Sequence, residues 1–190
     1  DLIGKVDGFA VELDIDSGAV GWSQRFTAKD KMTAPKYQAI AAQDIPAVQF
    51  ENDAGQMRII AGEYAGRHGP ASTFSPVNVW DGVLKAGHAE LIHAPADHTV
   101  LVTVLEGEML LNGAQRVLDS SIVMFAKDGE AAIQLQAVRD AKFLVLTGKA
   151  LDEPIQGYGP FVMNSKAEIA QAVSDFNSGK FGEIPVQAGS

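Results

Sequence analysis

Three of the four histidines in the sequence lie within eleven residues, and this cluster is the first feature that could support chemistry. His88, His93 and His98 supply imidazoles and Glu90 a carboxylate, which are common ligands of transition metals. If residues 88–92 form a strand, His88 and Glu90 share one face, whereas His93 lies on the other. The spacing matches no established metal motif. We therefore interpret these residues as polar groups at loop edges, and keep the four as weak candidate metal ligands.

Other catalytic signatures are missing from the sequence. The glycine-rich segment 62–70 has neither the Lys-Ser/Thr ending of a phosphate-binding loop nor dinucleotide-fold spacing, so we expect a tight turn there. No serine lies in a G-x-S-x-G elbow, and the chain has no cysteine. The acidic pair Asp152-Glu153 precedes Pro154 in an extended segment, where solvation explains it better than acid–base work. We expect no catalytic residue and no cofactor-binding loop.

Short apolar segments separated by turn residues must position these side chains. Alternating apolar residues predict a β-hairpin over 9–26 that turns at 16–18, and the polar segment 27–36 predicts a linker. Between 37 and 150, turn signals recur every 8 to 14 residues without helical patterns, which favours an all-β sandwich or barrel. The predicted strands are 45–50, 57–63, 77–84, 89–92, 98–105, 108–111, 121–125 and 141–147.

A helix is predicted near the end of the chain, over residues 165–179. Ser165 and Glu168 form a capping box, and Gly179 supplies a C-terminal stop. An apolar stripe at helical spacing indicates that this helix docks on a partner surface. The stripe consists of Ile169, Ala172, Val173 and Phe176. The predicted domains are an N-terminal β-hairpin and linker (1–36), a barrel (37–150), and an extended segment with the C-terminal helix (151–190).

The composition argues against several classes of function. The 190 residues include 24 acidic and 15 basic side chains, a net charge of −9, so nucleic acid and anionic membranes would be repelled. The longest apolar run, 100–105, is too short to cross a bilayer. We expect a cytoplasmic protein, and the lack of cysteine is compatible with a reducing compartment. The chain begins at Asp1 without a signal-peptide pattern, so we expect a processed product or a fragment of a longer protein.

Several segments together resemble the pirin family, whose members are built from two cupin barrels. The resembling segments are 28–38, 59–70, 75–87, 104–113 and 151–182. The last is the longest and most unusual in composition, and it is similar to the C-terminal cupin of a pirin with its tail helix. The resemblance implies an all-β, cupin-type double-stranded β-barrel, or jelly roll, with an N-terminal β-hairpin and one C-terminal α-helix.

The first cupin motif is degenerate by comparison with the general cupin pattern. Gly87, His93 and Gly107 stand at their expected positions. The second histidine position is Pro95, however, and the acidic position is Val100. Neither side chain offers a lone pair to a metal.

The second cupin motif has lost its metal ligand as well. Ser121 takes the leading glycine position, Gly129 remains, and the histidine position is Ala132. One surviving imidazole, that of His93, does not hold a divalent ion in competition with water. The resemblance places the family's single iron in the first cupin, whereas this chain resembles the second. We therefore expect no cofactor here, and iron if a metal is found.

Three hypotheses of function remain open. The first is a metal-free cupin that binds a protein partner or a ligand, with a homodimer or a second cupin domain covering the hairpin and tail helix. The second is an iron-dependent dioxygenase of the quercetinase type, whole or part, which the resemblance associates with some pirin-like proteins. The third is a small-molecule barrel with a vestigial pocket, although core packing explains its lining better. The candidate lining residues are Val79, Met109, Met124 and Phe143.

Overall fold

The computed structural model describes residues 9–13, 20–24, 28–31, 33, 38–125 and 132–182. The chain divides into two compact units, Asp1–Leu151 and Asp152–Ser190. Strands dominate the described residues, and the α-helix among them is α1, Lys166–Asn177; two short 3-10 helices span Ala42–Asp44 and Glu51–Asp53. The prediction of an all-β fold with one C-terminal α-helix is confirmed. None of the described helices has the length and apolar character needed to cross a membrane.

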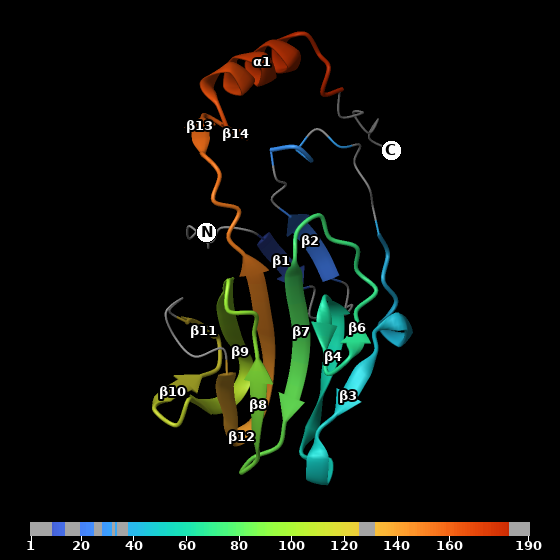
Figure 1. The fold of residues 1–190 in the computed structure, drawn as a ribbon, viewed down its shortest axis with the longest axis vertical. Helices are drawn as coiled ribbons and strands as arrows, with labels where there is room; N and C mark the ends of the chain where they lie inside the picture. The colour runs from blue at the N-terminus through green and yellow to red at the C-terminus, as the bar shows by residue number, and fades with distance from the viewer. Residues whose placement is uncertain are drawn as a thin grey trace, which may run out of the picture. The chain divides into compact units, whose positions relative to one another are not determined.

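The first unit is built on an eight-stranded antiparallel sheet (Figure 1). The strand order is β10-β9-β12-β7-β4-β3, while β11 also pairs with β9 and β8 also pairs with β12. The bounds are β3 Ala47–Gln49, β4 Gly55–Ala61, β7 Val77–Leu84, β8 Ala89–His93, β9 His98–Leu111, β10 Gln115–Leu118, β11 Ser121–Met124 and β12 Ala132–Lys149.

The two longest strands, β9 and β12, change neighbours along their length and so fold the sheet around its core. Residues 132–136 of β12 pair with β8, whereas residues 141–148 pair with β7. Three register shifts between Ala137 and Phe143 mark bulges against β9, and bulges bend strands. Gly107 has a φ of +88°, and a Cβ there would lie 2.0 Å from the carbonyl oxygen of Asp140. The bend therefore requires glycine.

This bend corrects part of the strand prediction. Residues 98–105 and 108–111 form one strand, because Gly107 serves a bulge and not a turn. The predicted strand 141–147 is the second half of β12, and β4 begins two residues earlier than predicted. Strand β10 and the small hairpin of β5, Glu63–Tyr64, and β6, Arg67–His68, have no counterpart in the prediction.

The N-terminal hairpin is confirmed. Strand β1, Phe9–Leu13, pairs antiparallel with β2, Val20–Gln24. The predicted turn at 16–18 lies outside the described residues, as do residues 27, 32 and 34–36 of the predicted linker.

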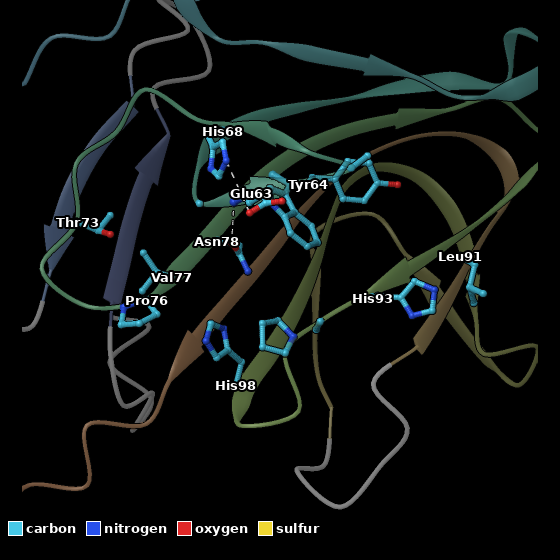
Figure 2. A pocket seen from close by; sticks show the side chains of 15 residues that line it. Glu63, Tyr64, His68, Thr73, Pro76, Val77, Asn78, Leu91, His93 and His98 are labelled. Atoms are coloured by element: carbon cyan, nitrogen blue, oxygen red, sulfur yellow. Dashed lines mark hydrogen bonds and ion pairs between the residues drawn. The ribbon is translucent and has the colours of Figure 1, made fainter.

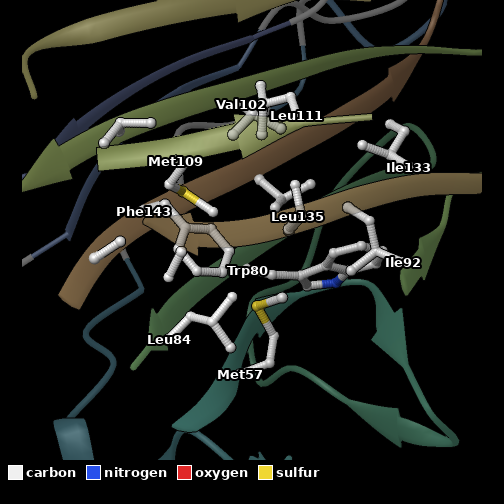
Figure 3. Close-up of a cluster of buried hydrophobic side chains, with 14 of the residues drawn as sticks. Met57, Trp80, Leu84, Ile92, Val102, Met109, Leu111, Ile133, Leu135 and Phe143 are labelled. Carbon is white, nitrogen blue, oxygen red and sulfur yellow. The ribbon is translucent and has the colours of Figure 1, made fainter. Parts of the chain in front are cut away.

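Most of the buried apolar side chains of the sheet form one large cluster (Figure 3), and Ile60, Ala61 and Val79 form a second, smaller one. Trp80 of β7 and Phe143 of β12 are the largest fully buried members of the large cluster, and Met57 of β4 packs with them. A Cβ at Gly82 would lie 2.3 Å from the ring of Phe143, so the glycine makes room for that ring. Strand alternation places these side chains on one face of the folded sheet.

The interpretation of the four candidate pocket-lining residues as packed core holds for three of them. Val79, Met109 and Phe143 are fully buried in packed core. Met124 is 63% exposed, so its expected inward position is wrong. Ile122 and Met124 alternate onto the solvent side of β11.

The second unit is a short hairpin followed by the predicted helix. Strands β13, Gln156–Tyr158, and β14, Phe161–Met163, pair within the segment predicted only as extended. The capping box is confirmed, because Ser165 Oγ accepts a hydrogen bond from Glu168 N at 3.2 Å and donates one to the Glu168 carboxylate at 2.9 Å. Gly179, at a φ of +75°, follows the last turn as predicted.

Candidate functional site

An open pocket of about 770 Å³ lies among the β5–β6 hairpin, β7, β8 and the start of β9 (Figure 2). Its apolar wall includes Pro76, Val77, Leu91 and Pro95. The ionisable and amide side chains around it come from elements far apart in the sequence, so the pocket exists only in the folded sheet. They are Glu63, Tyr64, His68, Asn78, His93 and His98.

The glycine-rich segment forms one rim of the pocket as a tight hairpin. Ala65 and Gly66 both have positive φ values, as a two-residue hairpin turn of the primed type requires. The expectation of a tight turn in this segment is confirmed. At Gly62, a Cβ would lie 2.0 Å from Asn78 Oδ1. The missing side chain therefore allows the backbone N–H of Glu63 to donate to Asn78 Oδ1 at 3.1 Å.

A buried chain of polar groups continues from Asn78 across three neighbouring strands. Asn78 of β7 lies opposite Thr147 of β12, and its Nδ2 donates to Thr147 Oγ1 at 2.8 Å. The same hydroxyl lies 2.8 Å from Nδ1 of His98, on β9. Thr147 has no exposed surface, and Asn78 and His98 are 8% exposed. Their orientation is therefore set by each other and not by solvent.

His98 is held in its neutral form. Burial lowers the pKa of its imidazole below the ordinary value, because desolvation penalises the charged ring. Asp97 raises that pKa and Lys149 lowers it, and these two side chains pair with each other at 2.8 Å. At neutral pH His98 carries a single ring proton and offers one donor and one acceptor.

Tyr64 forms an aromatic part of the wall. Its hydroxyl donates to Glu90 Oε1 at 3.0 Å, and burial together with the Glu90 charge raises the pKa of the phenol. The Tyr64 ring packs on Trp80 with 5.0 Å between centroids. Trp80 Nε1 is buried without a hydrogen-bond partner in the part of the chain that the structure describes.

The four candidate metal ligands do not converge. His93 and His98 both line the pocket, and Figure 2 shows them on separate strands of its wall. Glu90 is engaged by Tyr64, and His88 is not among the residues that line the pocket. Within residues 38–125 and 132–182 and the shorter described segments, no three His, Cys, Asp or Glu side chains are placed to hold one ion.

The fold brings two of the four cupin ligand positions together, but the side chains at the four positions do not fit a metal. His93 of β8 and Ala132 of β12 are direct cross-strand partners. Ala132 offers only a methyl group, Pro95 is exposed and Val100 is buried. A divalent ion needs several lone-pair donors at such a point, and the residues present supply one imidazole.

Sequence reasoning missed the buried polar pair Asn78 and Thr147. Their signal was available, since each is a polar residue inside an apolar strand segment, VNVW and VLTG. Such residues are usually hydrogen-bonded when buried. The sequence alone did not show that Asn78 and Thr147 are direct cross-strand partners, or that His98 lies diagonally across from Thr147.

Comparison with known proteins identifies the family. The Pirin C-terminal cupin domain matches residues 79–182. The chain is 44% identical, over 81% of its length, to a Pseudomonas aeruginosa protein named "Putative quercetin 2,3-dioxygenase", and 30% identical, over 90%, to Pirin-1 of Arabidopsis thaliana. It covers 53% and 60% of those two proteins.

Solved structures agree with this assignment. A quercetin 2,3-dioxygenase from Acinetobacter baumannii is 49% identical and superposes with a TM-score of 0.78, over 86% of this chain and 56% of that one. The chain thus spans little more than half the length of the relatives it matches. The cupin fold expected from the sequence is confirmed, and the chain belongs to the pirin family as a counterpart of its C-terminal cupin domain.

Proposed function

We propose that this chain is a metal-free binding module of the pirin family, which acts through a small ligand or a protein partner. The observation that carries the proposal is the pocket beside β7 and β8, several of whose polar side chains hydrogen-bond to other side chains, while no three His, Cys, Asp or Glu side chains among the described residues are placed to hold one ion. Pockets of this size with an apolar wall and a few fixed polar groups are typical small-molecule sites.

The degenerate cupin positions support the absence of a resident metal. His93 lies opposite Ala132, whose methyl group cannot bind a metal, and this supports the proposal. Restoring a metal would require new side chains at several positions.

Metal analysis of the protein purified without chelator tests this proposal. We expect iron, manganese and nickel well below one equivalent per chain, together with a thermal shift by at least some members of a panel of aromatic ligands. Stoichiometric amounts of any of these metals would overturn the proposal.

A second candidate is an iron-dependent dioxygenase of the quercetinase type, to which this chain would contribute part. The names of the Pseudomonas aeruginosa and Acinetobacter baumannii relatives support it. Since the chain spans about half of those proteins, the activity of the whole is a proposal for a longer protein. Oxygen uptake with quercetin by this chain, loaded with ferrous iron, would favour the dioxygenase over the binding module.

For partners, we propose a homodimer or a second cupin domain that covers the tail. Phe176 and Phe181 are each 60% exposed and pack around Phe161 at centroid distances of 6.0 and 6.5 Å. Exposed aromatic groups of this kind favour association. Light scattering at micromolar concentration tests the homodimer, for which a strictly monomeric species would be the contrary result.

A further inference from the structure

The buried polar chain beside the pocket has a single direction of proton donation. The N–H of Glu63 donates to Asn78 Oδ1, so the other end of that amide, Nδ2, is the donor to Thr147 Oγ1. The Thr147 hydroxyl proton then has one acceptor among the described contacts, Nδ1 of His98 at 2.8 Å. A neutral imidazole that accepts at Nδ1 carries its proton on Nε2.

The strand register fixes this arrangement. Thr147 lies directly opposite Asn78, and His98 is the partner of Lys149, one diagonal step from Thr147. Because Thr147 is fully buried, reversing the chain would leave buried groups without partners, and such groups are costly. The Nε2–H of His98 has no partner among the described residues, and His98 lines the pocket.

We infer that the pocket binds a neutral aromatic ligand bearing a carbonyl oxygen, and that His98 Nε2–H donates a hydrogen bond to that oxygen. The inference rests on the proposed binding function and deepens it, because it names the chemical class of the ligand and the residue that selects it.

The charges around the pocket favour a neutral acceptor. Among the described residues that line it there is no Lys or Arg, whereas Glu63 lines it and Glu90 accepts from Tyr64 at its edge. A carboxylate ligand would meet these negative charges, and among the described lining residues the group beside Glu63 that can offset them is the His68 imidazole, at 3.8 Å, when it is protonated. A cationic group can pair with Glu63, but it cannot accept the hydrogen bond that the Nε2–H of His98 offers.

The shape of the wall favours an aromatic body. The Tyr64 ring, packed on Trp80, supplies one aromatic surface, and Val77 and Leu91 add apolar contacts. Aromatic pairs in offset or edge-to-face arrangements add to simple burial. A volume of about 770 Å³ accommodates a two-ring ligand and leaves room for its carbonyl group.

Isothermal titration with three naphthalene derivatives of similar size tests the ligand class. Acetonaphthone carries a neutral carbonyl, naphthoate a carboxylate, and ethylnaphthalene no acceptor. We expect acetonaphthone to bind roughly five- to tenfold more tightly than the other two, as one hydrogen bond to a buried donor provides. Equal or stronger binding of naphthoate or ethylnaphthalene would overturn the inference while leaving a binding pocket in place.

Substitutions of His98 test the residue. His98→Phe keeps a ring but loses the donor, so acetonaphthone binding should weaken roughly five- to tenfold and approach that of ethylnaphthalene. His98→Gln retains an amide N–H near the position of Nε2 and should preserve most of the preference. His88→Phe, outside the pocket, is the matched control and should leave the three affinities unchanged. Loss of the preference in the control, or its survival in His98→Phe, would contradict the assignment.

Nitrogen-15 NMR of the histidine side chains tests the tautomer directly in the unsubstituted protein. We expect His98 in the Nε2–H form at neutral pH, and Thr147→Val to relax that preference towards a mixture. A His98 in the Nδ1–H form would overturn the inference, even if the titrations find a ligand. The proposed function would fail separately, through stoichiometric metal or through the absence of any ligand-induced shift.

Discussion

The barrel and the tail of this chain are stabilised in different ways. The barrel buries a continuous core in which Trp80, Phe143 and Met57 have almost no exposed surface. In the tail, over the described residues 152–182, Ala172 is the one buried hydrophobic side chain, and the large aromatic side chains Phe176 and Phe181 remain mostly exposed. The tail relies on a helix cap and on contacts at its aromatic edges.

The difference shows where each unit can tolerate change. Apolar burial contributes about 25 cal/mol per Å², so the barrel draws its stability from many filled positions and responds strongly when one is emptied. The tail gains little from burial within its own described residues. Its local interactions therefore carry a larger share of its stability.

Phe143→Ala should have the largest effect. The Phe143 side chain is fully buried against Gly82, so its removal leaves a cavity and should lower the free energy of unfolding by about 3–5 kcal/mol. Urea unfolding followed by fluorescence measures this loss. Val138→Ala on the same strand is the control, because Val138 is exposed and should cost less than about 1 kcal/mol. Similar losses in the two variants would show that the barrel interior is not close-packed.

Glu108 should make the barrel sensitive to acid. The hydrogen bond from Arg116, followed by the charges of Arg116 and Arg139, lowers the pKa of this buried carboxyl below its ordinary value of 4.5. The group therefore contributes stability that is fully present above pH 4.5 and is lost as the pH falls through its folded pKa.

Thermal unfolding between pH 7 and about pH 3 measures this contribution, because that range spans the ordinary pKa of a glutamate carboxyl. Glu108→Gln should flatten the acid side of the profile and lower stability at pH 7. Asp175→Asn is the matched variant in the tail, where Lys180 lowers the pKa of the carboxyl. We expect Asp175→Asn to change the barrel transition less than Glu108→Gln does. A larger effect of Asp175→Asn would contradict the role of Glu108 in the acid sensitivity of the barrel.

Local signals in the sequence predicted individual elements of both units, but they did not predict how the long strands of the barrel continue. An apolar segment bounded by turn residues located β7 at its observed bounds, and the capping box of Ser165 located the start of α1. The continuity of β9 was missed, because Glu106-Gly107 is a turn signal by composition and a bulge only in the context of Asp140 on a neighbouring strand. Pairing with a distant strand decides whether such a residue pair forms a turn or a bulge, and the residue pattern within one segment contains no information about that pairing.

The candidate site was predicted only in part for the same reason. His93 and His98 were singled out by residue type, and both line the pocket. Two side chains give His98 its orientation. Asn78 lies 20 positions before it in the sequence, and Thr147, which His98 contacts directly, lies 49 positions after it. Only the strand register brings them together.

Ser165→Ala should have a smaller, local effect on the tail. The Ser165 hydroxyl caps α1 by accepting from Glu168 N, and loss of such a cap costs about 1 kcal/mol. Amide hydrogen exchange of the first turn should quicken accordingly. Ser165→Asp keeps a capping oxygen and should retain most of the protection. Equal exchange rates in Ser165→Ala and Ser165→Asp would show that the cap does not stabilise the first turn.

Phe176→Ala should have the smallest effect if the tail is free in solution. Its ring is 60% exposed and packs edge-on against Phe161, so we expect a loss below about 1 kcal/mol. Thermal unfolding at two protein concentrations measures it. If a second copy covers this surface, the transition of the unsubstituted protein should rise with concentration and Phe176→Ala should abolish that rise. A loss of unfolding free energy as large as that of Phe143→Ala would then mean that Phe176, like Phe143, is buried, and that another copy of the chain supplies the surface that buries it.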